Sequence, residues 1–193
     1  AGACCPYNRG MSRHADDDTR TVYQGTYLRM RVKGNWEYAE RTKGGSAVII
    51  IARTPEDTLL FVEQFRVPLG KPTIEMPAGL VGDQDADDTF ERAAQRELLE
   101  ETGWRADKVE VLMVGPSSAG MSNELIAFVR ASGLSRVHAG GGDETEDITV
   151  HEVPVAEVPR WLAGKMADGY DMDPKLWAGL WLLDRNPDGS PAQ

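Results

Sequence analysis

The sequence predicts a mixed α/β fold, in which helices pack on a core that is mostly β-sheet. Three observations predict it. Short apolar stretches of strand length recur along the chain, one segment without Gly or Pro is long enough for a helix, and the C-terminal part again has helical patterns. The 193 residues suffice for one ordinary domain with a small appendage. The longest apolar run, Ala47–Ala52, is far shorter than the ~18 residues of a membrane helix, so no membrane partner is expected.

The charge of the chain limits the partners that it is expected to bind. Its 21 Lys and Arg against 31 Asp and Glu give a net charge of −10. An acidic protein repels nucleic-acid backbones and anionic lipids, so neither is expected as a partner. An anionic substrate would need a divalent cation to offset the same repulsion. Cys4 and Cys5 are neighbours and cannot staple a core, which favours a reducing, cytoplasmic setting.

The N-terminal region divides into a tail and a small β element. Residues 1–20 are polar and lack periodicity, so a flexible tail is expected. Residues 21–45 contain the β-type segments Thr21–Gln24, Tyr27–Val32 and Trp36–Arg41, which predict an antiparallel meander. A meander of this size cannot hold a core alone, so it must lean on the main domain or on a partner chain.

The main domain is expected over residues 46–187, with residues 188–193 as a second tail. Its predicted strands are Ala47–Ala52, Thr58–Phe65, Thr73–Met76, Val109–Val114, Leu125–Arg130 and Ile148–Val153. The strand at Thr73–Met76 is expected to stop at Pro77-Ala78-Gly79, and a glycine-rich loop is expected over residues 135–143. C-terminal helices are expected at Val155–Met166 and Pro174–Asp184, with Trp161, Trp177 and Trp181 packed in the core.

The clearest predicted helix runs from Thr89 to Thr102. It contains no Gly or Pro, Asp87 or Asp88 can cap its start, and Gly103 ends it.

Three glutamates near the end of this helix share one face. Glu97, Glu100 and Glu101 follow the spacing i, i+3, i+4, at which like charges destabilise a helix by a few tenths of a kcal/mol each. The C-terminal end of a helix also disfavours negative charge. A solvated acidic face is the simplest interpretation, but this unfavourable position favours a compensating cation. Carboxylates at this spacing offer the hard oxygen ligands that Mg²⁺ or Mn²⁺ prefers.

The segment that begins at Arg96 reads Arg-Glu-Leu-Leu-Glu-Glu-Thr-Gly and leads into the apolar Trp104. It resembles the second half of the Nudix box, Arg-Glu-aliphatic-x-Glu-Glu-x-Gly-aliphatic. In the first half the glycine position falls on Gly82 and the spacing is kept, but Asp88 stands where the family has glutamate. We prefer the alternative in which the glycine of Pro77-Ala78-Gly79 is the family glycine and the loop carries three extra residues.

Further segments resemble the ADP-ribose pyrophosphatase branch of this family. They are Glu63–Arg66, Ile74–Gly79, Trp36–Glu37 with Arg41, and Asp143–Ile148. The resemblance implies an α/β/α sandwich around a mixed sheet, with residues 46–187 as the Nudix hydrolase domain. It also implies a domain-swapped homodimer, in which the meander of one chain contacts the substrate base in the site of the other.

The resemblance implies a role for each of several residues. Glu97 and Glu101 match the principal metal ligands, and Glu100 supports them. The Ala78 carbonyl matches a further ligand, and Arg96 matches a residue that orients a carboxylate. Two or three Mg²⁺ ions are implied, with Mn²⁺ as a substitute.

Two loop glutamates also match family positions. Glu144 matches the general base, and Glu146 matches a ligand of an additional metal, although in isolation both would be interpreted as solubilising loop residues. The substrate contacts that the resemblance implies are Arg41 and Arg66 for the diphosphate, Trp36 for the base and Glu124 near the terminal sugar.

The implied reaction is hydrolysis of the diphosphate in ADP-ribose or a similar nucleoside diphosphate sugar, which gives AMP and a sugar phosphate. GDP-mannose or another nucleotide sugar is the alternative substrate. A non-catalytic Nudix module that binds nucleotides as a sensor is the alternative function.

Overall fold

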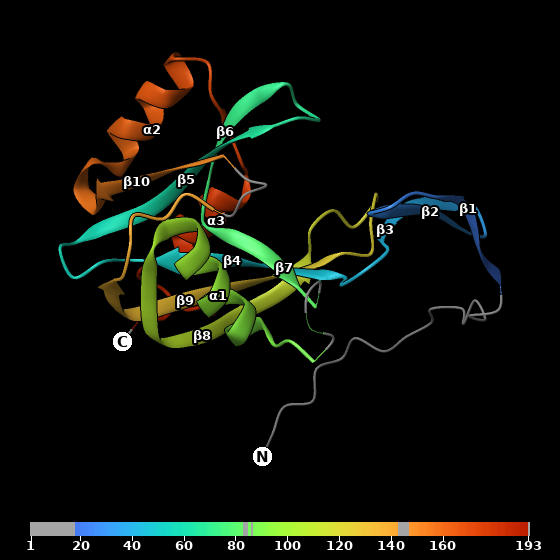
Figure 1. Cartoon of the computed structure of the whole chain (residues 1–193), viewed down its shortest axis with the longest axis horizontal. Helices are drawn as coiled ribbons and strands as arrows, with labels where there is room; N and C mark the ends of the chain where they lie inside the picture. Colours follow the sequence, from blue (N-terminus) through green and yellow to red (C-terminus); the bar gives the residue numbers. More distant parts are fainter. Residues whose placement is uncertain (1–17, 83–84, 86, 143–146, 193) are drawn as a thin grey trace.

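The computed structural model describes residues 18–82, 85, 87–142 and 147–192. Figure 1 shows a main body and a small sheet that stands out from it. This small sheet contains β1 (Thr19–Gln24), β2 (Leu28–Lys33) and β3 (Trp36–Arg41), each antiparallel to the next. The predicted meander is confirmed, and it begins at Thr19, two residues before its predicted start. Residues 1–17 of the predicted tail lie outside the described residues.

In the described part of the chain, two four-stranded sheets make up the main body, with the orders β7-β4-β9-β8 and β10-β5-β6-β11. Their strands are β4 (Ser46–Ala52), β5 (Thr58–Arg66), β6 (Lys71–Glu75), β7 (Ala78–Val81), β8 (Trp104–Pro116), β9 (Leu125–Arg136), β10 (Ile148–Pro154) and β11 (Asp171–Met172). The pairs β4–β9 and β6–β11 are parallel, and the other described pairs are antiparallel. Both sheets are therefore mixed.

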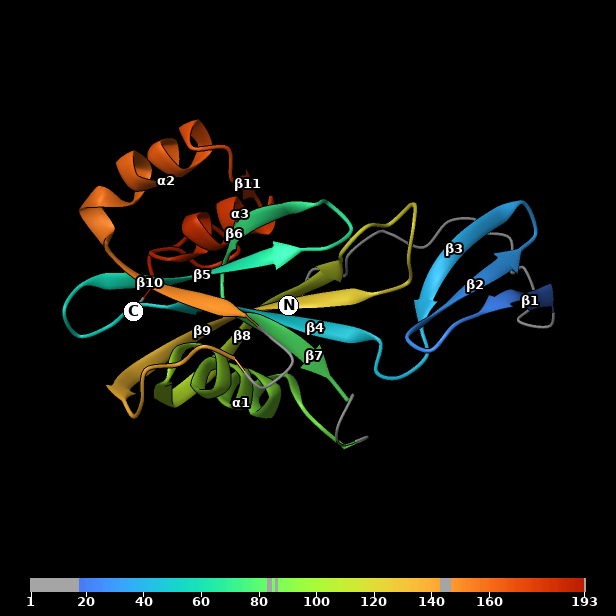
Figure 2. The ribbon, with the colours of Figure 1, turned by 45° about the horizontal axis from the view of Figure 1, so that its top comes forward.

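Helices cover the two sheets from both sides (Figure 2). Helix α1 (Phe90–Thr102) lies on one side, and α2 (Val158–Ala167) and α3 (Lys175–Leu182) lie on the other. This is the predicted α/β/α sandwich. Within the described residues, no helix is both long enough and apolar enough to cross a membrane.

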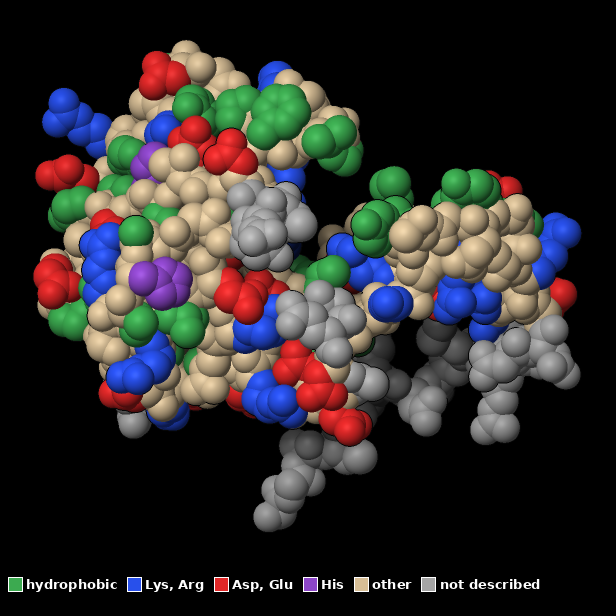
Figure 3. All heavy atoms as spheres, viewed as in Figure 1, with side chains coloured by type: hydrophobic (Ala, Val, Ile, Leu, Met, Phe, Trp, Pro, Cys, Tyr) green, Lys and Arg blue, Asp and Glu red, His purple; other side chains and the backbone are tan. Residues whose placement is uncertain are grey.

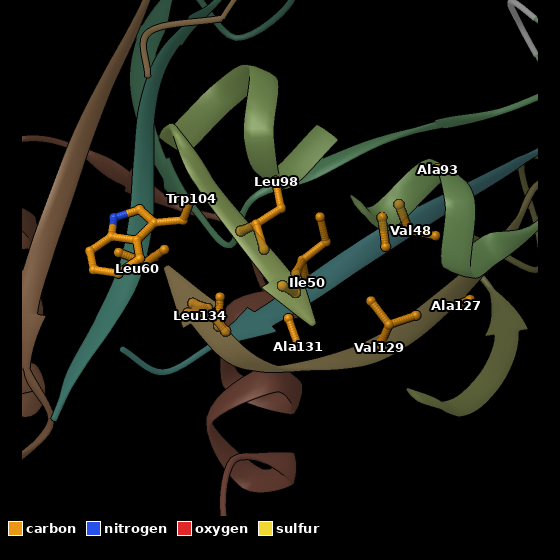
Figure 4. Close-up of a cluster of buried hydrophobic side chains, with 13 residues drawn as sticks. Val48, Ile50, Leu60, Ala93, Leu98, Trp104, Ala127, Val129, Ala131 and Leu134 are labelled. Carbon is orange, nitrogen blue, oxygen red and sulfur yellow. The ribbon is translucent and has the colours of Figure 1, made fainter. Parts of the chain in front are cut away.

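Strand β4 is buried on both faces because its alternate side chains enter two different cores. Val48 and Ile50 point to the core under α1, where they pack near Leu98 (Figure 4). Ile49 and Ile51 belong to the second core, which α2 and α3 cover. A strand buried on both faces is apolar throughout, which is why this segment is the longest apolar run of the chain.

Only one of the two predicted ends of α1 is confirmed. Gly103 ends the helix with a left-handed φ of 73°, as predicted. The cap at the other end is Thr89, whose side chain accepts a hydrogen bond from the N–H of Arg92 at 3.3 Å. The prediction of Asp87 or Asp88 as the cap was wrong, because either acid lies too early for the helix that forms.

Several predicted boundaries were also wrong. The strand predicted at Thr73–Met76 runs from Lys71 to Glu75, and a strand that was not predicted, Ala78–Val81, follows and pairs antiparallel with β4. The β8–β9 ladder is longer than predicted, so Ser135 and Arg136 belong to β9 and not to the loop. The helix predicted from Val155 begins as a 3₁₀ turn, η2 (Val155–Glu157).

The three C-terminal tryptophans do not share one environment. Trp161 packs its ring 5.1 Å from that of Phe61, between ring centroids. Trp177 and Trp181 are 48% and 54% exposed, so the prediction that they lie in the core was wrong.

Glu63 of β5 ties α2 to the second sheet. Its carboxylate accepts hydrogen bonds from Lys165 Nζ at 2.8 Å and Tyr170 Oη at 3.1 Å, and it contacts His151 Nε2 at 2.9 Å. Burial raises the pKa of Glu63, but these hydrogen bonds outweigh it and bring the pKa below the ordinary value of 4.5.

This shift predicts a pH-dependent stability. A depressed carboxyl pKa stabilises the fold above the pKa of the unfolded state, and this contribution is lost as the pH falls through the folded-state pKa. Glu63→Gln should lower the free energy of unfolding by about 1–2 kcal/mol at pH 7. The difference from the wild type should shrink below about pH 4 in urea titrations. The exposed Glu56→Gln is the control, and a deficit of equal size at pH 7 and pH 3 would contradict this account.

Candidate active site

A cleft of about 830 Å³ brings together most of the predicted site residues. Those that line it are Arg41, Arg66, Ala78, Arg96, Glu97, Glu100, Glu101 and Glu124. Figure 3 shows acidic and basic side chains next to one another on the face of the main body that carries α1. Trp36 lines a separate hollow of about 710 Å³, and Glu144 and Glu146 lie outside the described residues.

Helix α1 carries two buried carboxylates to the cleft. Glu97 and Glu101 are one helical turn apart and only 9% and 5% exposed, whereas the side chain of Glu100 is 43% exposed. The N–H of Ala78, the first residue of β7, donates a hydrogen bond to Glu101 Oε2 at 3.0 Å. The backbone at Ala78 therefore lies beside a buried carboxylate. Two groups that bind the same cation must lie this close together.

Gly79 leaves the space that the Glu97 side chain occupies. A Cβ at this position would stand 1.9 Å from Glu97 Cδ and 2.2 Å from Glu97 Oε1. Glycine is needed here for close approach. The other candidate for the family glycine, Gly82, has a left-handed φ of 78°. Asp88, which accompanies Gly82 in that alignment, places Oδ2 3.7 Å from Arg96 Nη2.

Arg96 links the acidic cluster to β7. Its Nη1 donates hydrogen bonds to Glu97 Oε1 at 2.7 Å and to Glu100 Oε2 at 3.3 Å. Its Nη2 donates to the carbonyl oxygen of Leu80 at 3.0 Å. One guanidinium thus holds two carboxylates and the neighbouring strand in a fixed arrangement.

The glycine-rich loop covers the C-terminal end of α1. The N–H groups of Gly141 and Gly142 donate to the carbonyl oxygens of Glu101 and Glu100 at 2.8 and 3.2 Å. These bonds satisfy helix carbonyls that would otherwise lack partners. A Cβ on Gly140 would lie 2.6 Å from the Glu101 carbonyl oxygen, so the loop needs glycine to approach this closely. The loop is anchored on the two glutamates immediately before residues 143–146.

Two more arginines line the cleft, each in an ion pair. Arg66 forms two parallel bonds with the buried Glu75, from Nε at 2.6 Å and from Nη2 at 2.7 Å. The hydrogen bonds with Glu75 raise the pKa of Arg66 against the opposing effect of burial. Arg41 Nε donates to Glu124 Oε1 at 2.5 Å. Such pairs fix the plane of a guanidinium, which suits recognition of phosphate.

Arg41 lies at the cleft because β3 is tied to the loop before β9. The N–H of Ala39 donates to the carbonyl of Met121 at 2.8 Å, and Asn123 Nδ2 donates to Glu40 Oε1 at 2.8 Å. Trp36, at the other end of β3, is 66% exposed and does not line the cleft of its own chain.

Sequence reasoning assigned no role to several residues of the cleft. Glu75 was overlooked, although a glutamate inside an apolar strand is a signal, because a buried charge requires a partner. Gln64, Asp171 and Asp173 carry no local pattern that separates them from ordinary surface residues.

The charges and donor atoms of the cleft suit a divalent cation. The lining carboxylates belong to Glu75, Glu97, Glu100, Glu101, Glu124, Asp171 and Asp173, and the lining cations to Arg41, Arg66, Arg96 and Lys175. Across the described ranges, no three Asp, Glu, His or Cys side chains gather closely enough to hold an ion by themselves. The possible ligands in the described residues are therefore two buried carboxylates and the adjacent backbone, which supply only some of the hard oxygens that a cation needs. Mg²⁺ accepts such a set, because it keeps water and substrate phosphates as its other ligands.

Comparison with known proteins gives a consistent picture. Residues 43–172 match the NUDIX domain model. The chain is 33% identical over 154 residues to the methanol dehydrogenase activator of Bacillus methanolicus, covering 76% of this chain and 82% of that protein. It is 33% identical over 165 residues to the GDP-mannose pyrophosphatase of Escherichia coli (strain K12), covering 79% and 84%. The fold is similar to the crystal structure of an ADP compounds hydrolase, with a TM-score of 0.68, 20% identity and coverage of 91% and 95%.

The close contact at Gly79 predicts that this glycine controls cation binding. Gly79→Ala should displace the Glu97 carboxylate and weaken binding of Mn²⁺ at least about tenfold. The signal of unbound Mn²⁺ in electron paramagnetic resonance titrations measures this. Gly115→Ala is the matched control, because a Cβ there meets no atom within 4 Å. A folded Gly79→Ala protein with wild-type Mn²⁺ affinity would contradict the assignment.

Proposed function

Because the chain belongs to the NUDIX family and is a Nudix pyrophosphohydrolase, we propose that its substrate is ADP-ribose or a similar nucleoside diphosphate sugar. The products are then AMP and a sugar phosphate. The observation that carries this proposal is the placement of two buried carboxylates, Glu97 and Glu101, in a cleft that also presents oriented arginines. The acids suit a cation, and the arginines suit a diphosphate.

The metal-binding residues in this proposal are Glu97, Glu101 and the carbonyl of Ala78, with Glu146 as a ligand from the segment outside the described residues. They would hold two or three Mg²⁺ ions, for which Mn²⁺ can substitute. Such ions, when bound, neutralise phosphate charge and lower the pKa of a coordinated water. Arg96 keeps the Glu97 carboxylate oriented through its 2.7 Å hydrogen bond.

The other residues bind the substrate and move a proton. Arg41 and Arg66 bind the diphosphate oxygens, and Glu124 lies near the terminal sugar. Glu144 takes a proton from the attacking water as the water oxygen bonds to phosphorus. The bridging P–O bond breaks, and its electron pair stays on the departing phosphate. We assign the protein to a reducing, cytoplasmic setting, because its two cysteines, Cys4 and Cys5, are neighbours in the sequence and cannot staple a core.

GDP-mannose is a second candidate substrate. The relatives of this chain named GDP-mannose pyrophosphatase include proteins of Escherichia coli and Yersinia enterocolitica, each about a third identical. Mass identification of the products from a panel of nucleoside diphosphate sugars with Mg²⁺ separates the two candidates.

The non-catalytic sensor remains the alternative from another class, and burial disfavours it. Burying two carboxylates has a large desolvation cost, and a module that only binds nucleotides has no need of them.

We further propose a domain-swapped homodimer. The small sheet exposes several large apolar side chains, and exposed apolar surface is typical of an interface. They are Val22, Tyr23, Tyr27, Leu28 and Trp36. Trp36 does not reach the cleft of its own chain, so we assign it to the base in the site of the partner subunit.

The ligand role of Glu101 predicts a large loss of turnover on a conservative change. Glu101→Gln should lower kcat about a hundredfold to a thousandfold and leave the fold intact, because it removes one anionic ligand without changing shape. Phosphorus NMR of the products and circular dichroism measure the two effects. Glu91→Gln, in the exposed first turn of the same helix, is the control. Unchanged turnover of Glu101→Gln would exclude the ligand role, whereas wild-type protein that binds these nucleotides without turnover would favour the sensor.

The domain swap predicts complementation between two impaired variants. Trp36→Ala alone should raise KM about tenfold or more, because base stacking is lost. When Trp36→Ala and Glu101→Gln subunits are mixed and allowed to exchange, one site of each heterodimer has both wild-type residues. Activity at low substrate concentration should therefore rise above that of either variant. A mixture that shows only the average of the two would contradict the swap, and exchange is verified by mass spectrometry.

A further inference from the structure

One wall of the cleft takes no part in the reaction described above. It contains a lateral row of polar residues across three strands, with Gln64 of β5 opposite Thr73 of β6, and Thr73 opposite Asp171 of β11. Cross-strand partners point to the same face of a sheet, and all three residues line the cleft. In the β5–β6 register the row lies between the positions of Arg66 and Glu75, so it adjoins the ion pair that we assign to the diphosphate.

Two members of this row have polar groups without partners. The Thr73 side chain is buried, and its Oγ1 has no hydrogen-bond partner among the described residues. Gln64 is half-buried, and within the described part of the chain its amide makes no hydrogen bond either. The Gln64 amide therefore keeps its donor and its acceptor for a ligand in the cleft, whereas Thr73 Oγ1 has almost no accessible surface and offers no contact.

The charges along this wall offset each other. Asp171 Oδ1 lies 3.5 Å from Lys71 Nζ, and Asp173 Oδ2 lies 2.5 Å from Lys175 Nζ. These carboxylates would repel a further phosphate, because Lys71 and Lys175 are already paired with them. An apolar ring would leave the Gln64 amide unpaired. An uncharged group with several hydroxyls can pair with both the Gln64 amide and the Asp171 carboxylate, so the chemistry of the wall suits a sugar.

The wall is held in place from its other face. Glu63, next to Gln64 in β5, points away from the cleft and accepts a hydrogen bond from Tyr170, the residue before Asp171. At the other end, Asp173 Oδ1 accepts a hydrogen bond from the N–H of Lys175 at 2.8 Å. Both ends of the short strand are therefore fixed before a ligand binds, which lowers the entropic cost of recognition.

We propose that Gln64 and Asp171, at the two ends of this row, form the subsite that recognises the hydroxyl groups of the substrate's terminal sugar. Asp171 accepts hydrogen bonds from the hydroxyls, and Gln64 donates and accepts. The row adds to the contact assigned to Glu124. The inference rests on the proposed function, and it makes Asp171 and Gln64 the residues that distinguish a nucleotide sugar from a nucleotide that ends at its second phosphate.

The test compares two ligands that cannot be hydrolysed, by calorimetry with the full chain and Mg²⁺. One is the α,β-methylene analogue of ADP-ribose, and the other is α,β-methylene-ADP, which lacks the sugar. A parallel pair carries guanine and mannose. Asp171→Asn and Gln64→Met each keep the size of the side chain, and Asp184→Asn, which lies beyond the C-terminal end of α3 and does not line the cleft, is the control. Each cleft variant should weaken the sugar-bearing ligand about tenfold and change the sugar-free ligand less than twofold.

Each outcome gives a decision. Equal weakening of both ligands, or unchanged affinity for the sugar-bearing one, overturns the subsite and leaves the proposed function standing. Wild-type protein that binds the two members of each pair equally also overturns the subsite. Wild-type protein that binds none of the four ligands overturns the proposed function, and the subsite with it.

Discussion

Two carboxylates buried at the C-terminal end of α1 determine how the rest of the site is built. Burial and the helix dipole both oppose the charges of Glu97 and Glu101 at this place. The fold responds with Arg96 beside Glu97, the N–H of Ala78 on Glu101, and glycine N–H groups on the last helix carbonyls. The cleft still carries more acids than bases. A divalent cation would stabilise this arrangement further, which is why we connect the cluster with diphosphate chemistry.

The three sheets contribute different parts of the site. The sheet that contains β4 and β7 supports α1 and therefore the acidic cluster. The sheet that contains β5, β6 and β11 presents the Arg66–Glu75 pair and the polar row next to it. The small sheet supplies Arg41 from the end of β3, while Trp36 at the other end remains exposed. Under the proposed function, the sheet of β5, β6 and β11 serves both the phosphates and the sugar, and the small sheet serves the phosphates and the base.

Local patterns predicted the parts of this structure that depend on neighbours in sequence. The spacing of the three glutamates gave their common face, Gly103 gave the helix end, and the run at Ala47–Ala52 gave the buried strand. Contacts between distant segments could not be predicted in this way. The need for glycine at position 79 follows from Glu97, 18 residues later, and Asp171 joins the cleft only through the parallel pairing of β11 with β6. Trp177 illustrates the converse, because a helical apolar pattern does not say which face meets the core.

The central claim is that the carboxylates of α1 hold divalent cations that bind the substrate diphosphate. Crystals grown with Mn²⁺ and the α,β-methylene analogue of the hydrolysed nucleotide sugar test it most directly, through anomalous scattering at the manganese edge. The account predicts anomalous peaks between the carboxylate oxygens of Glu97 and Glu101 and the diphosphate. A bound diphosphate with no manganese at these two side chains would contradict it.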